Sequence, residues 1–255
     1  MSLRFERYVA IGDSSTEGLD DPDGQGGYRG WANRLAEQIA RTQGSLLYAN
    51  LAIRGRRTRQ ILEEQLDPAL LMQPDLVSLF CGTNDLLRRE FDADAVGCDI
   101  EFMQRSCVAS GATVVTFTMP DLASVLPMAR CVAPRLHDLN RTLRAVAEET
   151  GTILVDLADE PLATDRRFWS SDRLHANADG HERIAIALAI ALGFPPPTDD
   201  WNAPLPAEPR RTVGRRLASE LLWGGKHLVP WVGRRLLGRS SGDGVRAKRP
   251  ELRAV

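Results

Sequence analysis

The sequence has few aromatic residues and no long apolar run. Aromatic side chains make up 6% of its 255 residues. The longest apolar stretch, "IAIALAIALGF" at 184–194, falls short of the roughly 18 residues that a membrane-spanning helix needs. The N-terminal "MSLRFERYVA" is charged at Arg4, Glu6 and Arg7 and has no apolar core of a secretory signal. We therefore expect neither a transmembrane span nor a signal, and the cytoplasm is the default location.

Several motifs for cofactors, metals and catalysis are also absent. There is no Walker A run, no G-x-S-x-G turn and no HExxH pair. The glycine-rich "DGQGGYRGW" (23–31) lacks the GxGxxG spacing. The cysteines show neither CxxC nor zinc-finger spacing, so we expect reduced, mostly buried thiols. They are Cys81, Cys98, Cys107 and Cys131. We expect no cofactor and no metal.

Charge is nearly balanced overall but unevenly distributed. The formal net charge is −2, which gives the whole chain no strong attraction to nucleic acid. Residues 195–255 hold 12 Lys and Arg against 6 Asp and Glu, whereas residues 1–194 hold 20 against 28. An acidic body thus carries a basic tail, and this asymmetry suggests a separate role for the tail.

Short apolar runs alternate with longer helical patterns. The runs show no polar alternation, which predicts strands buried on both faces of a parallel sheet. They are "YVAIG" (8–12), "LLYANLA" (46–52), "DLVSLFCG" (75–82), "TVVTFTMP" (113–120) and "TILVDL" (152–157). Helix patterns lie near 27–43, 57–71, 92–110, 130–150 and 178–192. The alternation predicts a three-layer α/β/α fold with about five parallel strands.

A change of composition divides the chain near residue 194. Six prolines lie between 195 and 209, which predicts a linker or an extended surface segment after a domain of residues 1–194. The final "SSGDGVRAKRPELRAV" (240–255) has the composition of a disordered end.

Residues 210–240 mix apolar and basic side chains. Trp and Leu residues stand among arginines there, a pattern that suits contact with an anionic membrane surface or a protein partner. The members are Trp223, Trp231, Arg215, Arg216, Arg234, Arg235 and Arg239. The alternative is that the segment wraps around the domain and buries its apolar side chains.

Polar residues follow the ends of several predicted strands. They are "GDS" at 12–14, "NLAIRG" at 50–55, "GTND" at 82–85 and "DRLH" at 172–175. Because ligands bind at the carboxyl ends of parallel strands, these segments are expected to meet at one edge. Acyl transfer through a covalent intermediate needs a nucleophile, a base, a group to orient the base, and oxyanion donors.

The residues at these ends can supply those functions. Ser14 can act as the nucleophile and His175 as its base, with Asp172 three residues away to fix the tautomer. Gly55 allows close approach to its backbone N–H, and the amide of Asn84 is a neutral donor. Local sequence alone favours a helix N-cap for Ser14, and only the other segments favour a nucleophile.

With these four segments, the sequence resembles the SGNH hydrolases, also called GDSL esterases and lipases. The blocks occur in the family's order over roughly residues 7–193. The resemblance implies a flavodoxin-like sheet and metal-independent cleavage of small acyl esters. It implies Ser14, Asp172 and His175 as the triad, with Ser14, Gly55 and Asn84 as the oxyanion hole. Ser15 stands where many members carry Leu. Acyl transfer or carbohydrate deacetylation could use the same site.

Several nearby residues have simpler interpretations. Ser15 and Asp85 are expected to have structural roles, and Asp13 to bind loop backbone rather than to orient the base. His181 lies near Asp179 but has no acid three residues before it, so it is expected to be structural, as are His137 and His227. No lid helix is evident, which favours an open esterase for short acyl chains.

Overall fold

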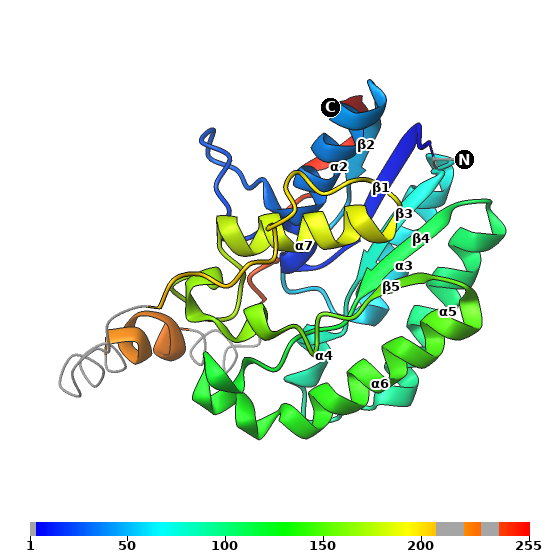
Figure 1. Cartoon of the computed structure of the whole chain (residues 1–255). Coiled ribbons are helices and arrows are strands. Elements are labelled where there is room, and N and C mark those ends of the chain that lie inside the picture. The colour runs from blue at the N-terminus through cyan, green and yellow to red at the C-terminus, as the bar shows by residue number, and fades with distance from the viewer. Residues whose placement is uncertain (1–3, 208–221, 231–239) are drawn as a thin grey trace.

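A six-stranded sheet forms the centre of the molecule (Figure 1). The computed structural model describes residues 4–207, 222–230 and 240–255. The strands are β1 (Arg7–Gly12), β2 (Leu47–Asn50), β3 (Leu76–Phe80), β4 (Thr113–Phe117), β5 (Ile153–Val155) and β6 (Arg249–Ala254). Their order is β5-β4-β3-β1-β2-β6. The first five are parallel, as predicted, and β6 is antiparallel to β2.

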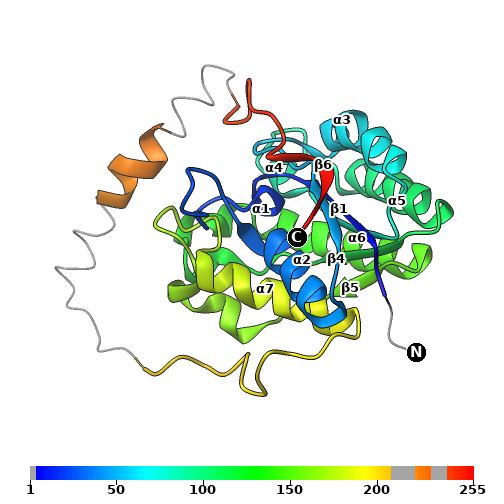
Figure 2. The same ribbon diagram turned by 90° about the horizontal axis from the view of Figure 1, so that it is seen from above.

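Helices cover both faces of the sheet, which confirms the three-layer α/β/α fold. On one face α2 (Gly30–Gln43) packs against α7 (Ala178–Ala191). On the other face lie α3 (Thr58–Leu71), α5 (Ala93–Ala109) and α6 (Ala133–Thr150). Figures 1 and 2 show the two groups on opposite sides of the strands.

Alternation along β1 explains why two separate cores form. Val9 and Ile11 pack in the core on the side of α3, α5 and α6, whereas Tyr8 and Ala10 pack in the core shared with α2 and α7. Successive side chains of a strand point to opposite faces, so an apolar run without alternation fills both cores. Burying one such large side chain contributes about 1.5–3 kcal/mol.

Short helices and turns gather at the carboxyl ends of the strands. They are α1 (Ser14–Glu17), α4 (Thr83–Leu86), η1 (Leu122–Ser124), η2 (Pro127–Cys131), η3 (Pro161–Thr164) and η4 (Arg166–Phe168). Each follows a strand before the next long helix begins. This edge is where the polar segments were expected to meet.

The C-terminal residues correct one expectation. Residues 240–255 were predicted to be disordered, but Arg249–Ala254 forms β6 at the edge of the sheet. The Lys248 ammonium donates to the carbonyls of Tyr28 and Arg29 at 2.9 and 2.8 Å, and the guanidinium of Arg249 donates to the Tyr48 carbonyl at 2.8 Å. Charged and proline-containing sequences are typical of edge strands, which is why the composition resembled disorder.

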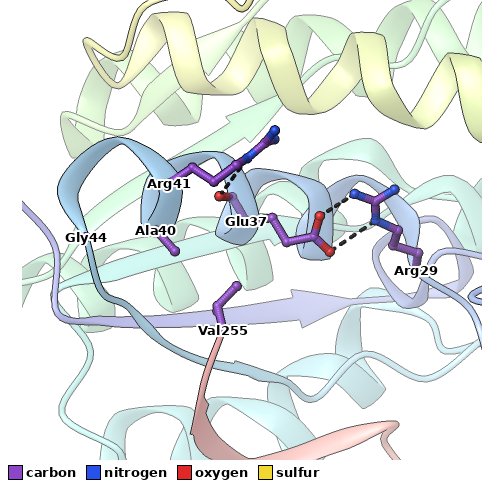
Figure 3. A pocket seen from close by; sticks show the side chains of 6 residues that line it. All are labelled: Arg29, Glu37, Ala40, Arg41, Gly44 and Val255. Carbon is purple, nitrogen blue, oxygen red and sulfur yellow. Dashed lines mark hydrogen bonds and ion pairs between the residues drawn. The ribbon is translucent and has the colours of Figure 1, made fainter.

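The last residue lies beside α2 (Figure 3). A hollow of about 390 Å³ there is lined by Arg29, Glu37, Ala40, Arg41, Gly44 and Val255. Arg29 and Glu37 form an ion pair in it, and Arg41 donates to the Glu37 carbonyl at 3.3 Å. These contacts are structural, and the hollow contains no nucleophile.

Most of the basic segment lies outside the described residues. Within it the structure describes 222–230, a helical segment that includes η5 (Gly224–Leu228). The flanking arginines and Trp231 belong to the residues not described, so the membrane or partner contact stays a prediction. In the described ranges, no helix combines the length and the apolar character needed to cross a bilayer.

The four cysteines are unpaired. Cys81 and Cys107 are buried, whereas Cys98 and Cys131 are exposed, so the expectation of mostly buried thiols holds for two of them. Burial raises the pKa of Cys107 to about 12, which keeps this thiol protonated and unreactive.

Candidate active site

Ser14 is the first residue of α1, directly after the turn that ends β1. Gly12 makes this turn possible, because a Cβ there would lie 2.5 Å from the Phe80 carbonyl oxygen. The Gln65 side chain holds Gly12 from both sides: its oxygen accepts from the Gly12 N–H at 2.8 Å and its amide donates to the Gly12 carbonyl at 2.9 Å. The backbone beneath Ser14 is therefore closely fixed.

Asp13 connects two of the sequence segments. It caps α1 by accepting from the Ser15 N–H at 3.1 Å. Its other oxygen accepts from the Thr83 hydroxyl at 2.8 Å and from the Asn84 amide at 3.0 Å. Burial raises the pKa of Asp13 to about 6, although the hydrogen bonds from Thr83 and Ser15 oppose the shift. Asp13 was expected to bind loop backbone, and it binds the Ser15 N–H together with the side chains of Thr83 and Asn84.

Ser14, His175 and Asp172 form one hydrogen-bonded chain. His175 Nε2 lies 2.8 Å from Ser14 Oγ, and His175 Nδ1 lies 2.7 Å from Asp172 Oδ2. A carboxylate only accepts, so Nδ1 carries the proton and Nε2 is left to accept from the serine hydroxyl. The three residues come from segments about 160 positions apart, and the structure brings together the set that the sequence predicted.

The turn around Asp172 orients both partners. Asp172 Oδ1 accepts from the backbone N–H groups of Leu174 and His175 at 2.8 and 3.0 Å. Burial alone would raise the pKa of Asp172, but hydrogen bonds from His175 and Ser170 and the charge of His175 hold it well below its usual range. Burial would lower the pKa of His175, yet the hydrogen bond and charge of Asp172 raise it. The pair therefore favours an ionised carboxylate beside the imidazole.

A second carboxylate, which the sequence did not single out, faces His175. Asp20 Oδ2 lies 4.0 Å from His175 Nδ1, and its charge also raises the pKa of His175. The Ser170 hydroxyl lies between the two acids, 2.6 Å from an oxygen of each. Asp20 adopts φ +67°, a left-handed conformation that Asp and Asn tolerate better than most residues. The sequence signal that could have pointed to Asp20 is its position six residues after Ser14.

The acidic cluster could suggest a metal site, because Asp20, Asp172 and His175 bring ligand atoms within 4.8 Å of one another. However, both ring nitrogens of His175 already have partners, one in Ser14 and one in Asp172. The donor set is consistent with a hydrogen-bonded network, and it needs no ion to explain it.

Glu17 holds the loop that contains Gly55. The buried Glu17 carboxylate accepts from the Arg54 N–H at 2.7 Å and pairs with the Arg54 guanidinium. Gly55 follows with φ +73°, and a Cβ there would lie 2.4 Å from the Ser240 hydroxyl. Any other residue would meet both strain and a clash.

The three predicted oxyanion donors, Ser14, Gly55 and Asn84, differ in whether their N–H groups already have acceptors. Within the described ranges, no group accepts a hydrogen bond from the N–H of Ser14 or of Gly55. The Asn84 amide, in contrast, donates to Asp13 Oδ2 and to the Arg56 carbonyl, both at 3.0 Å. Ser14, Gly55 and Asn84 all line the same cavity.

This cavity measures about 850 Å³ and is bounded mainly by apolar side chains. Ser14 and His175 stand at one part of it, and the ends of β3, β4 and β5 contribute Phe80, Phe117 and Val155. The size is typical of pockets that hold small organic ligands.

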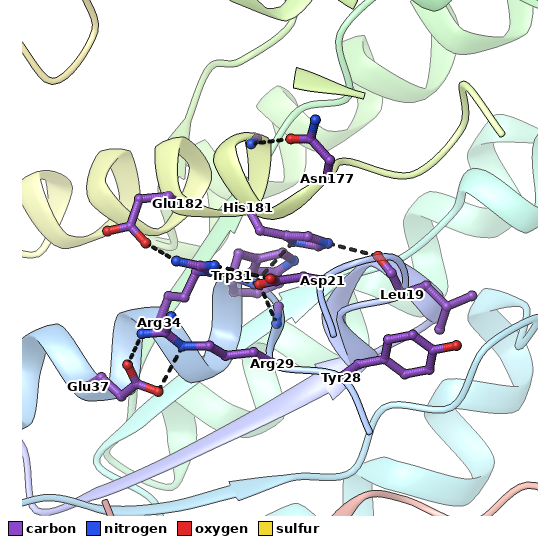
Figure 4. A network of polar contacts seen from close by, with 12 residues as sticks. Leu19, Asp21, Tyr28, Arg29, Trp31, Arg34, Glu37, Asn177, His181 and Glu182 are labelled. Carbon is purple, nitrogen blue, oxygen red and sulfur yellow. Dashed lines mark hydrogen bonds and ion pairs between the residues drawn. The ribbon is translucent and has the colours of Figure 1, made fainter. Parts of the chain in front are cut away.

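His181 belongs to a polar network that joins α2, α7 and the loop between α1 and α2 (Figure 4). Its Nδ1 accepts from the Trp31 N–H at 3.1 Å, and its Nε2 donates to the Leu19 carbonyl at 3.0 Å. Arg34 joins Asp21 to Glu182 beside it. Burial lowers the pKa of His181 to about 4. His181 is structural, as predicted.

Comparison with known proteins identifies the family. Residues 10–183 match the model of the GDSL-like Lipase/Acylhydrolase family. The chain belongs to this family. As a GDSL-like acylhydrolase it is a carboxylic ester hydrolase.

Individual relatives agree with this assignment. An acetylxylan esterase of Geobacillus stearothermophilus is 26% identical over 222 residues, which are 74% of this chain and 94% of the relative. The solved structure of that organism's acetylxylan esterase Axe2 matches with a TM-score of 0.63 at 20% identity, over 76% of this chain and 98% of that one. The esterase EstA of Pseudoalteromonas sp. matches with a TM-score of 0.59 at 17% identity, over 74% and 97%. These structures share the fold of this acylhydrolase.

Proposed function

We propose that the protein cleaves acyl esters through an acyl-enzyme on Ser14, with His175 as base and Asp172 as its partner. The observation that carries the proposal is the unbroken chain from Ser14 Oγ to His175 Nε2 at 2.8 Å and from His175 Nδ1 to Asp172 at 2.7 Å. Solved structures of the Geobacillus enzyme include catalytic mutants in which one serine or one histidine is replaced by alanine, which supports the same pair of residue types here.

In the first step Ser14 Oγ attacks the ester carbonyl while its proton moves to His175 Nε2. Asp172 stabilises the imidazolium that forms, because its carboxylate already accepts from Nδ1. The new Oγ–C bond gives a tetrahedral intermediate. His175 then gives the proton to the leaving alkoxide as its C–O bond breaks.

The negative oxygen of the intermediate needs donors that are not already used. The N–H groups of Ser14 and Gly55 meet this requirement. The Asn84 amide joins them when it gives up its bond to Asp13 or to Arg56. Such a set of donors typically supplies several kcal/mol of transition-state stabilisation. In the second half of the cycle, a water attacks the acyl carbon and gives its proton to His175, which forms a second tetrahedral intermediate. The Ser14 Oγ–C bond then breaks, His175 returns the proton to Oγ, and the carboxylic acid leaves.

A fluorophosphonate probe tests this assignment on the full chain. We expect the label on Ser14 after peptide mapping, and we expect Ser14→Ala to lose about 10⁴-fold or more in kcat on p-nitrophenyl esters. Ser15→Ala is the matched control, because the Ser15 hydroxyl only accepts from the Trp31 indole at 3.3 Å. Labelling of another residue, or undiminished turnover by Ser14→Ala, would contradict the proposal.

The acetylxylan esterase relative favours one alternative, the deacetylation of a carbohydrate. Acyl transfer to an alcohol would use the same acyl-enzyme with a different acceptor. Product analysis with acetylated xylo-oligosaccharides, and with added alcohols, separates the three reactions. We expect free acid as the main product in water.

A further inference from the structure

The cavity beside Ser14 is much larger than an acetyl group requires. Its volume is about 850 Å³. Along α7 its lining extends from Gly180 to Ile190, a length of roughly 15 Å at the helical rise of 1.5 Å per residue. The site therefore has room for a long substituent on one side of the reacting carbonyl.

The walls of this space are apolar. Opposite α7, the turns η1, η2 and η3 contribute aliphatic side chains, and η4 contributes an aromatic ring. The main contributors are Leu122, Leu126, Leu162, Phe168 and Ile184. The guanidinium of Arg183 also lies there, 5.4 Å from the centre of the Phe168 ring. Arg135, Asp156 and Glu160 also line the cavity, but most of its wall is apolar. Such a wall suits a hydrocarbon chain better than a hydroxyl-rich sugar.

Trp223 is one of the residues that line the cavity. Its indole N–H donates to the Asp172 carbonyl at 3.1 Å, and the Arg173 guanidinium lies over its ring at 5.0 Å. His227, one turn further along the same segment, also lines the cavity. The segment 222–230 is thereby attached to the loop that carries Asp172 and His175, while Leu222 and Val229 point to solvent with 74% and 65% exposure.

We propose that this cavity holds the acyl chain of the substrate, that Trp223 completes its wall, and that the protein prefers esters of medium-length fatty acids, such as octanoate, over acetate. This rests on the proposed role of Ser14. The acyl part is the occupant because it stays bound through both half-reactions, whereas the alcohol must leave before water attacks. The proposal differs from the sequence-based expectation of an open esterase for short acyl chains, because the cavity is large and residues of the C-terminal segment contribute to its lining.

The first test compares kcat/KM of the full chain on p-nitrophenyl acetate, butyrate and octanoate below their aggregation limits. Octanoate has six more methylenes than acetate, and each contributes up to about fourfold when it leaves water completely. At about twofold each, for partial burial, octanoate should exceed acetate by roughly 60-fold. A maximum at acetate would overturn the proposal. If acetate is the best substrate but Ser14→Ala still loses all activity, only the chain-length proposal fails, and the proposed role of Ser14 stands.

A pair of isomeric esters distinguishes the acyl chain from the alcohol. Ethyl octanoate and octyl acetate have the same composition, and only the position of the carbonyl differs. We expect faster cleavage of ethyl octanoate. Faster cleavage of octyl acetate would mean that the cavity takes the alcohol, and would overturn the assignment.

Two alanines on α7 provide a matched pair of variants. Ala187 lines the cavity, whereas Ala191 lies in the next turn, is exposed and does not line it. Ala187→Phe should lower the octanoate-to-acetate ratio of kcat/KM by about tenfold, and Ala191→Phe should leave it unchanged. Rates are normalised to sites titrated with the fluorophosphonate, so a misfolded fraction does not count. An unchanged ratio in Ala187→Phe contradicts the proposal.

Two variants of Trp223 test whether its ring forms part of the cavity wall. Trp223→Ala should lower the same ratio, and Trp223→Phe should restore most of it, because the ring supplies the apolar surface. If Trp223→Phe behaves like Trp223→Ala, the indole hydrogen bond to the Asp172 carbonyl matters instead of the wall, and this part of the proposal fails.

Discussion

His175 and His181 lie six residues apart and both bind residues of the segment 14–31, but their pKa values shift in opposite directions. His175 sits at the rim, where Nε2 faces the Ser14 hydroxyl and Nδ1 faces Asp172. His181 sits behind the rim, where Nδ1 accepts from the Trp31 N–H and Nε2 donates to the Leu19 carbonyl. The pKa of the first is raised and that of the second is lowered to about 4.

The difference lies in what each ring faces. His175 faces carboxylates, which stabilise its charged form, and a hydroxyl whose proton it can take. Both partners of His181 are backbone groups, and they require the neutral ring, because a proton on Nδ1 would face the Trp31 N–H. The partners of each ring, rather than its place in the sequence, therefore set the direction of its pKa shift, and only His175 has the partners that the proposed base needs.

The largest expected effect separates the two by activity. His175→Ala should lower kcat about 10⁴-fold, because the serine loses its base. His181→Ala should keep kcat within about tenfold per titrated site, since it touches no reacting group. Steady-state kinetics on p-nitrophenyl esters measures both. Equal losses in the two variants would mean that the comparison is wrong.

The next prediction concerns the donor at the rim that is already occupied. Asn84→Ala should lower kcat by about 10²–10³-fold, the usual cost of losing one oxyanion donor. KM should change little, because the oxyanion forms only in the transition state. A kcat within threefold of the wild type would show that Asn84 only ties Asp13 to the Arg56 loop.

His181→Ala should show its main effect in stability. The variant leaves the Trp31 N–H without its acceptor, and a buried unsatisfied group costs about 1–3 kcal/mol. Urea unfolding at pH 7.5 measures this loss. Under the same conditions His175→Ala should lose clearly less, because its ring lies at the edge of the cavity.

The pH dependence of stability provides a further check on His181. Its pKa is about 4 in the fold against 6.5 for an ordinary histidine, so the unfolded chain takes up the proton first as the pH falls. Stability from this group is complete above pH 6.5 and is lost between there and pH 4, by up to about 3 kcal/mol at 1.36 kcal/mol per unit. The slope should be shallower in His181→Ala.

The smallest effect should come from Asp20. Activity requires neutral His175, so kcat/KM should fall as the pH drops through the raised pKa of His175. Asp20→Asn removes one of the negative charges that raise this pKa and tolerates the same left-handed backbone, so the acid limb should move to lower pH. A pH–rate profile measures the shift. An unmoved limb would mean that Asp172 alone sets the basicity.

Much of the fold could be read from the sequence because its signals are local. Strands buried on both faces appear as continuous apolar runs, and helices show their own period. The predicted runs at 8–12 and 113–120 correspond to Arg7–Gly12 and Thr113–Phe117. β6 was missed, since an exposed edge strand needs neither an apolar run nor β-branched residues and is held mainly by its hydrogen bonds to β2.

The residues of the candidate site also divide into those that local motifs predicted and those that they did not. Ser14, Gly55, Asn84, Asp172 and His175 were found because each lies in a short motif after a strand, and parallel strands end at one edge. Asp20, Ser170 and Trp223 were not found. Their contacts with the site belong to no local motif: the Ser170 hydroxyl meets Asp20 from 150 positions away, and Trp223 meets Asp172 from 51 positions away.

By itself, the sequence determined the order of the elements and the chemical groups at the strand ends, because both follow from local patterning. Only the tertiary structure decided which groups face one another: that a second acid stands beside His175, that two backbone groups surround the ring of His181 and burial lowers its pKa, and that Trp223 lines the cavity beside Ser14. These depend on distances between segments far apart in the chain, and no local pattern encodes such distances.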